Sequence, residues 1–175
     1  MKLGIIGATG AVGKVFLDLL PKSKLNVSEL RLTASKRSIG KKIKYNDTDY
    51  MVQENSEDFY DGLDYVFSSA SAEVSKKAAE KSKKYNAIMI DDSSEFRMNE
   101  DVPLVVPEIN SESLKSHNGI VAIPNCTTTP LAMILDAVRS EYNLKRVIVD
   151  TYQAVSGTGN LAIKELLDQT KHYLE

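Results

Sequence analysis

A short apolar run followed at once by a glycine-rich loop opens the chain, and this pairing constrains the fold more than any other feature. Residues 3–6 predict a buried strand, and residues 12–20 carry apolar side chains at helical spacing up to Pro21. Gly7, Gly10 and Gly13 lie at the junction. A strand, a glycine turn and a helix in this order are typical of the first unit of a parallel α/β sheet.

Each of these glycines has its own structural use. Gly7 permits a sharp exit from the strand, Gly10 lets the backbone approach a pyrophosphate, and Gly13 allows the helix to pack close to the sheet. The helix N-terminus would hold the pyrophosphate with its N–H groups and its dipole. The spacing GxxGxxG differs by one residue from GxGxxG and lacks the lysine of a P-loop. A glycine turn without a ligand is the alternative, but the position between first strand and first helix favours a bound dinucleotide.

The rest of the chain alternates short apolar runs with amphipathic stretches. Further strands are expected at residues 30–34, 42–45, 49–53, 65–68, 87–90, 104–106, 120–123 and 147–154, with a turn at 46–47. Further helices are expected at residues 71–84, 111–115, 128–142 and 161–174. The predicted fold class is therefore α/β, a Rossmann-type doubly wound and mostly parallel sheet with helices on both faces. We expect one domain over residues 1–175.

Composition excludes several classes of protein. The 175 residues carry 22 Lys and Arg against 24 Asp and Glu, a net charge of −2, so nothing indicates nucleic acid or an anionic membrane as a partner. The single cysteine excludes an intrachain disulfide framework and suits a reducing compartment. No apolar run approaches the roughly 20 residues that span a bilayer. We expect a cytoplasmic protein whose partner is a small molecule.

The segment after the second strand bears on which dinucleotide is bound. NAD-binding folds usually place an Asp or Glu there to hold the ribose 2′-hydroxyl. Residues 33–41 read TASKRSIGK, which contains no acid but does contain Arg37 and Ser38. A 2′-phosphate requires cations and hydroxyl donors, and an acid would repel it. A solvated basic loop is the alternative; the position favours NADP over NAD.

The only cysteine, Cys126, lies in the segment PNCTT between an apolar run and a predicted helix. A thiol at a helix N-terminus feels the positive end of the dipole and free N–H groups, and both favour the nucleophilic thiolate. The Cys126 N–H or Asn125 could hold the oxyanion formed by attack on a carbonyl. A buried, inert cysteine is the alternative. Pro124 places the thiol on a turn, which favours the nucleophile.

No base for this thiol can be identified in the sequence. The two histidines, His117 in a polar turn and His172 on the last helix, are expected at the surface. Arg97 follows a strand end, the usual place for ligand groups in such sheets, and could bind an anionic substrate. A surface ion pair with Glu95 or Glu100 is its alternative.

A second glycine-rich loop, YQAVSGTG at residues 152–159, follows the last expected strand and precedes a helix. It could bring Gln153 to the substrate and backbone amides to the nicotinamide side of the coenzyme. A plain connecting turn is the alternative.

Together these motifs resemble the aspartate-semialdehyde dehydrogenase family. The resemblance is carried in the family's order by GATGAVG (7–13), SKRSIGK (35–41), VVPEIN (105–110), PNCTT (124–128) and TYQAVSG (151–157). It implies reductive dephosphorylation of 4-phospho-L-aspartate to L-aspartate 4-semialdehyde with NADPH, on the route to lysine, threonine and methionine.

The resemblance also implies a role for each site residue. Cys126 would carry an acyl-thioester, and Gln153 would orient the substrate. Arg97 would bind the phosphate or substrate anion, and Asn125 would line the same pocket. The contacts to NADP would come from Gly7, Thr9, Gly10, Ala11, Val12, Arg37, Ser38, Ser156 and Gly157.

The family carries a second, substrate-binding and dimerisation domain, which supplies a histidine acid/base and most of a homodimer interface. The sequence is therefore expected to be an N-terminal fragment that binds NADP weakly and does not turn over. Within the enzyme class, the alternatives are a malonyl-CoA reductase on the same scaffold and N-acetyl-glutamyl-phosphate reductase, which usually has Gly where Asn125 stands. A non-catalytic NADP-binding module is the alternative from another class.

Overall fold

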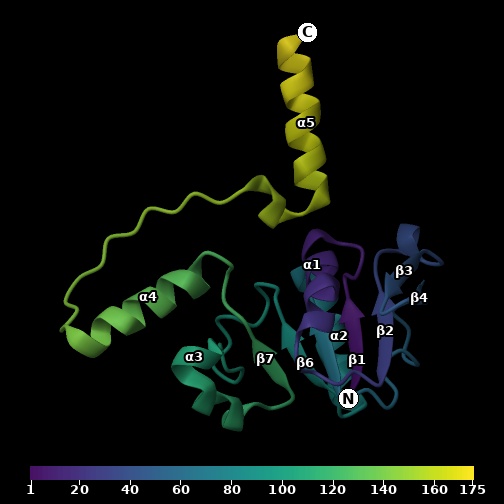
Figure 1. Ribbon diagram of the computed structural model, residues 1–175, viewed down its shortest axis with the longest axis horizontal. Helices are drawn as coiled ribbons and strands as arrows, with labels where there is room; N and C mark the ends of the chain where they lie inside the picture. Colours follow the sequence, from purple (N-terminus) through teal and green to yellow (C-terminus); the bar gives the residue numbers. More distant parts are fainter.

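The computed structural model describes residues 1–175 and places the first strand, β1 (Lys2–Ile6), near the middle of a seven-stranded sheet (Figure 1). The strand order is β3-β4-β2-β1-β5-β6-β7. The other strands are β2 (Glu29–Thr33), β3 (Lys42–Tyr45), β4 (Thr48–Gln53), β5 (Tyr65–Ser68), β6 (Ile88–Asp91) and β7 (Ile120–Ala122). Every neighbouring pair is parallel except the β3–β4 hairpin. Asn46 and Asp47 form its turn with φ of 47° and 62°, so the predicted turn is confirmed.

Two helices cover opposite faces of this sheet. Successive strand residues point to opposite faces, and on β1 Ile5 packs in the core under α1 (Ala11–Leu19), whereas Ile6 packs in the core under α2 (Ala72–Lys84). Ser71 caps α2, because its hydroxyl accepts the Val74 N–H. The predicted fold class, a doubly wound sheet with helices on both faces, is confirmed.

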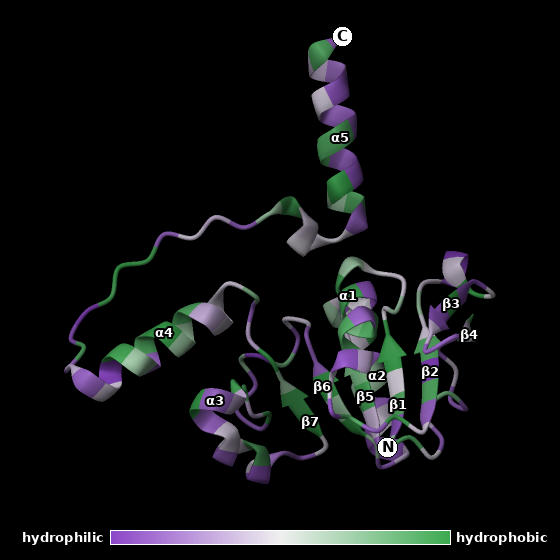
Figure 2. Ribbon diagram, in the orientation of Figure 1, coloured by the Kyte–Doolittle hydropathy of each residue, from purple (hydrophilic) through white to green (hydrophobic).

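The chain after residue 124 runs away from this body. The remaining elements are the 3₁₀ turns η1 (Leu20–Lys22), η2 (Lys36–Ser38), η3 (Ser111–Ser116) and η4 (Val155–Thr158) and the helices α3 (Pro107–Asn110), α4 (Thr128–Glu141) and α5 (Asn160–Leu174). Figure 1 shows α5 projecting away from the sheet, joined to α4 by a long extended segment. No residue after Pro124 is buried. Figure 2 shows hydrophobic residues along both α4 and α5. No helix is long and apolar enough to cross a membrane.

Two expected strands are wrong. Residues 147–154 are extended but pair with no strand, and Ile148 is 76% exposed. The apolar pattern there is that of a strand, but no sheet edge lies alongside it to accept its backbone hydrogen bonds. Residues 104–106 contribute only a bridge between Leu104 and Ala122, because Pro107 lacks an N–H and begins α3 instead.

Candidate functional site

A cavity of about 470 Å³ lies at the carboxyl ends of the central strands. Open α/β sheets bind their ligands at this edge, at the point where the strand order reverses. Here β2 lies on one side of β1 and β5 on the other, so the reversal is at β1. The loops after β1, β2, β5 and β6 line it, together with η4 and the start of α5. Eight residues predicted to contact the coenzyme are among its lining: Gly7, Thr9, Gly10, Ala11, Val12, Arg37, Ser156 and Gly157.

The glycine loop is held close against its neighbours by backbone contacts. Gly7 has φ of +89°, and a side chain on it would collide with the Ser69 carbonyl oxygen. A side chain on Gly13 would collide with the Gly7 carbonyl oxygen. The Gly10 N–H donates to that same oxygen at 2.8 Å, and α1 begins at the next residue with no acid in its first turn. The free N–H groups of α1 therefore face the cavity without a competing negative charge.

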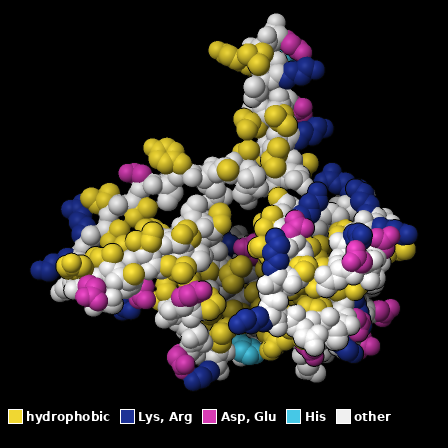
Figure 3. All heavy atoms as spheres, viewed as in Figure 1, with side chains coloured by type: hydrophobic (Ala, Val, Ile, Leu, Met, Phe, Trp, Pro, Cys, Tyr) yellow, Lys and Arg dark blue, Asp and Glu magenta, His cyan; other side chains and the backbone are white.

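A second, basic pocket of about 520 Å³ adjoins this cavity and contains Ser38, the remaining predicted coenzyme residue. Its charged lining residues are Lys14, Arg37, Lys41 and Lys42, and no carboxylate lines it. Of these, only Lys42 has a carboxylate within reach, Asp49 at 3.8 Å. Lys and Arg side chains gather on the body beside the base of α5 in Figure 3. This is the electrostatic environment that a phosphate requires.

Thr9 connects the glycine loop to the basic pocket. Its hydroxyl donates to the Ser38 hydroxyl at 3.3 Å, and both residues line the pocket. Ser38 itself is buried, held on the 3₁₀ turn η2 that also carries Arg37. The structure thus brings the end of β2 and the loop after β1 into one site.

The thiol of Cys126 is exposed, so this cysteine is not a buried core residue. Asn125, the residue before the cysteine, accepts two hydrogen bonds at the start of α4. Its Oδ1 accepts the Thr127 N–H at 2.9 Å, and its carbonyl oxygen accepts the Thr128 N–H at 2.9 Å. Asn125 therefore satisfies two N–H groups just before and at the start of this helix, whose N-cap residue is Thr127. No protein group accepts the Cys126 N–H, so this donor is free beside the thiol.

Gln153 bridges the thiol turn and the second glycine loop. Its Oε1 accepts the Asn125 Nδ2–H at 3.3 Å, and its side chain packs directly over Gly157. Cys126, Thr127 and Gln153 share a cavity of about 400 Å³ with Ala11, Val12, Ser156 and Gly157. The last four residues also line the larger cavity, so the thiol lies at its edge.

Arg97 is tied to the ends of two strands. Its Nε donates to the Ile123 carbonyl oxygen and its Nη2 to the Asp92 carbonyl oxygen, each at 2.9 Å. Its nearest carboxylate is that of Asp92 at 3.8 Å, so the ion pair considered with Glu95 or Glu100 is wrong. The Nη1 nitrogen donates to no protein group. Arg97 therefore holds together the ends of the two strands that lead to the site, although it lines neither the cavity at the strand ends nor the cavity that holds Cys126.

Asp92 belongs to the segment after β6 that the sequence indicated as a place for ligand groups, and it lines the cavity. The residues after β5 also line it but were not singled out from the sequence. The Asp92 carboxylate accepts the Ser69 hydroxyl at 3.1 Å. Burial raises the pKa of Asp92, while the Ser69 hydrogen bond and Arg97 lower it. Ser69, Ala70 and Ser71 follow a strand end directly. The rule that ligands lie at the carboxyl ends of parallel strands is the sequence signal that could have identified these residues.

Neither histidine contacts Cys126, and of the two expected at the surface only His172 is fully exposed, whereas His117 is half-buried. His117 accepts the Gly119 N–H on Nδ1 at 3.0 Å and lines a separate apolar cavity on the sheet. His172 is exposed on α5.

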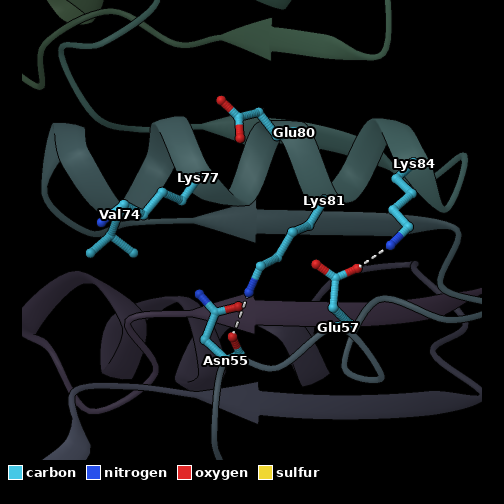
Figure 4. Close-up of a pocket in the computed structure, with 7 residues that line it drawn as sticks. All are labelled: Asn55, Glu57, Val74, Lys77, Glu80, Lys81 and Lys84. Atoms are coloured by element: carbon cyan, nitrogen blue, oxygen red, sulfur yellow. Dashed lines mark hydrogen bonds and ion pairs between the residues drawn. The ribbon is translucent and has the colours of Figure 1, made fainter.

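Another pocket, of about 440 Å³, lies on the outer face of α2 (Figure 4). Two of its lysines bind residues of the same pocket: Lys84 pairs with Glu57 at 2.8 Å, and Lys81 donates to the Asn55 carbonyl oxygen at 2.8 Å. These contacts fasten α2 to the segment before β5. The pocket belongs to the packing of the body rather than to the site at the strand ends.

Comparison with known proteins places this geometry in context. Residues 2–117 match the family model for the semialdehyde dehydrogenase NAD-binding domain, and residues 135–175 match the model for the semialdehyde dehydrogenase dimerisation domain. Aspartate-semialdehyde dehydrogenase of Bacillus subtilis is 44% identical over 174 residues, and that of Synechocystis is 41% identical over 175. These alignments cover 99% and 100% of this chain but 50% and 52% of the relatives. The chain thus spans about half the length of the curated relatives it matches.

Solved structures agree with the sequence relatives. Aspartate semialdehyde dehydrogenase II of Vibrio cholerae, complexed with ASA, matches with a TM-score of 0.92 and 37% identity, over 99% of this chain and 52% of that one. The aspartate semialdehyde dehydrogenase of Candida albicans with NADP matches with a TM-score of 0.64 and 28% identity, over 82% of this chain and 48% of that one.

Proposed function

The chain belongs to the semialdehyde dehydrogenase family, and from that premise we propose that it supplies the coenzyme-binding and thiol-bearing part of an NADP-dependent aspartate-semialdehyde dehydrogenase. One observation carries the proposal. Val12 of the glycine loop and Ser156 of the second loop line both the cavity at the strand ends and the cavity that holds Cys126. A nucleotide and a carbonyl bound to the thiol would therefore meet.

The proposed reaction uses the thiol as the nucleophile. The Cys126 thiolate attacks the acyl carbon of 4-phospho-L-aspartate, the bond to phosphate breaks, and a thioester forms. The free Cys126 N–H lies where it can stabilise the negative charge that develops on the carbonyl oxygen. When bound, NADPH would supply a hydride to the thioester carbon, and the carbon–sulfur bond would then break to release the semialdehyde and return the Cys126 thiolate. Gln153 and Asn125 would orient the substrate, and the Nη1 nitrogen of Arg97 would bind its anionic group.

Specificity for NADP rests on the basic pocket. An unpaired Arg37 and the Ser38 hydroxyl lie beside the cavity, with Lys14 and Lys41 near them and no carboxylate in the lining. A ribose 2′-phosphate is held by such donors, whereas a 2′-hydroxyl gains less from them. This supports NADP over NAD as the coenzyme.

We propose that the chain forms a dimer through α4 and α5. The helices α4 and α5 expose large apolar side chains, including Ile134 at 62% and Leu167 at 63%. Surfaces of this kind are normally covered. The match of residues 135–175 to a dimerisation-domain model supports a homodimer. The exposed thiol must stay reduced to act, which suits a cytoplasmic protein.

Alkylation of Cys126 tests whether thiol and coenzyme share a site. Iodoacetamide is added to the 175-residue chain, and the rate is followed by intact mass with and without saturating NADPH; the chain in denaturant is the reference. We expect a reactive thiol that NADPH protects, because the two cavities share four residues. An inert thiol in a chain that still binds NADPH would contradict the thioester and support a non-catalytic nucleotide-binding module.

A further inference from the structure

The cavity at the strand ends carries one charge of each sign, and these lie at its opposite ends. Among its lining residues the only cation is Arg37 and the only acid is Asp92. Arg37 follows β2 and Asp92 follows β6, with β1 and β5 between those strands. Three strand spacings of about 4.8 Å separate the two ends by about 14 Å. A dinucleotide lying across the strand ends would span this distance, with one half at each charge.

The position of Cys126 fixes which half of the coenzyme meets Asp92. The basic pocket with Arg37 and Ser38 lies at the β2 end, which assigns that end to the adenosine 2′-phosphate. Cys126 follows β7, the neighbour of β6 on the opposite side. Since hydride must pass between the nicotinamide and a carbon held on the thiol, the nicotinamide belongs at the β6 end. Asp92 is the carboxylate at that end.

The charge of the nicotinamide changes with its oxidation state. The ring is a cation in NADP⁺ and neutral in NADPH, so a carboxylate nearby attracts the oxidised form alone. The Asp92 side chain is 22% exposed, and a half-buried charge is weakly screened. The charged groups that face it are the Arg97 guanidinium at 3.8 Å and the adjacent Asp91. Arg97 offsets part of the charge, but its Nε and Nη2 hydrogen bonds go to backbone carbonyl oxygens.

We propose that Asp92 makes this site discriminate between the two redox states of the coenzyme, binding NADP⁺ more tightly than the same site would without the carboxylate. The inference rests on the proposed function, since it needs the nicotinamide to lie at the β6 end. It also gives the preference a pH dependence. Protonation of Asp92 removes the negative charge, so the preference for NADP⁺ decreases as the pH falls through the pKa of this carboxyl group.

The test is the ratio of NADP⁺ to NADPH affinity in the 175-residue chain and in Asp92→Asn. The amide is isosteric and its Oδ1 can still accept the Ser69 hydroxyl. Both coenzyme forms carry the same adenine and 2′-phosphate, so the ratio isolates the nicotinamide. We expect Asp92→Asn to weaken NADP⁺ roughly tenfold and to leave NADPH unchanged. Glu95→Gln is the matched control, because it removes a charge from the same loop without lining the cavity, and its ratio should equal that of the unchanged chain.

A second measurement does not depend on the variant folding: the ratio in the unchanged chain is followed as the pH is lowered, and it should fall. A ratio that Asp92→Asn leaves unaltered, or an equal loss of both forms, would overturn the inference while the proposed function stands. Failure of the unchanged chain to bind either coenzyme would overturn the proposed function and this inference together.

Discussion

Arg37 is the residue on which coenzyme choice depends most in this account. It lines the main cavity and the basic pocket together and has no carboxylate partner. Its guanidinium is therefore free to pair with a phosphate rather than with the protein. The neighbouring Ser38 is buried and hydrogen-bonded to Thr9, so its hydroxyl is already held in place.

Arg37→Ala should weaken NADPH binding by about 10- to 100-fold, the usual value of a hydrogen bond to a charged group. NADH, which lacks the 2′-phosphate, should be affected little. Lys76→Ala removes an equal charge from the outer side of α2 and serves as the control. Calorimetric titration of both nucleotides measures the effect. Equal losses for NADPH and NADH would place the 2′-phosphate elsewhere.

Tyr60 gives the core its own pH dependence. The side chain is fully buried, its hydroxyl lies 2.6 Å from Asn55 Oδ1, and burial raises its pKa to about 12. In the unfolded chain a tyrosine ionises near pH 10, so the unfolded state loses protons first and the free energy of unfolding falls between about pH 10 and 12. Tyr60→Phe should show a shallower fall over that range. Denaturant unfolding at a series of alkaline pH values checks it, and parallel curves for the two chains would contradict it.

At the scale of elements, the β1–α1 unit depends on the close approach of its backbone. α1 packs so near the loop that Gly13 has no room for a side chain, and the oxygen it would strike belongs to Gly7. Gly7 cannot easily move, because its N–H donates to the Thr33 carbonyl oxygen at 3.0 Å. The same contact that positions the N–H groups of α1 therefore makes the unit intolerant of change.

Gly13→Ala should lower the free energy of unfolding by about 3 kcal/mol through overpacking and should abolish NADPH binding. Gly40→Ala is the comparison: it has φ of +82° but open space around it, so only backbone strain of about 1 kcal/mol is expected. Urea unfolding of the two variants measures the difference. Equal losses would contradict the steric argument, because Gly13 does not have a positive φ that would itself require glycine.

At the scale of the whole molecule, the residues that form the core and some of the residues that complete the cavity lie in different parts of the chain. Every buried residue lies at or before Pro124, whereas Ser156 to Leu161 line the cavity. The sheet and its two helices should therefore fold without residues 143–175, and the cavity should be incomplete without them.

A chain ending at residue 142 should retain the midpoint and slope of cooperative urea unfolding, because no buried contact is removed. Its NADPH affinity should fall, since one wall of the cavity is missing. Unfolding at clearly lower urea would show that residues 143–175 stabilise the body.

The sequence predicted elements well where a short-range pattern determines them. The strand–glycine–helix unit and the β3–β4 turn follow from local periodicity and turn chemistry, and both are present. The strand expected at residues 147–154 was wrong because pairing depends on a neighbouring strand that no local pattern reveals. Arg97 and Asp92 were not paired in advance because their contact depends on how the β6 and β7 ends meet.

The central claim is that this chain holds NADP at the carboxyl ends of its sheet. Titration of the 175-residue chain with NADPH and with NADH tests it most directly. We expect NADPH to bind at least about tenfold more tightly than NADH, in keeping with the unpaired cations of the basic pocket. Equal affinity for the two, or no binding of either, would contradict the account.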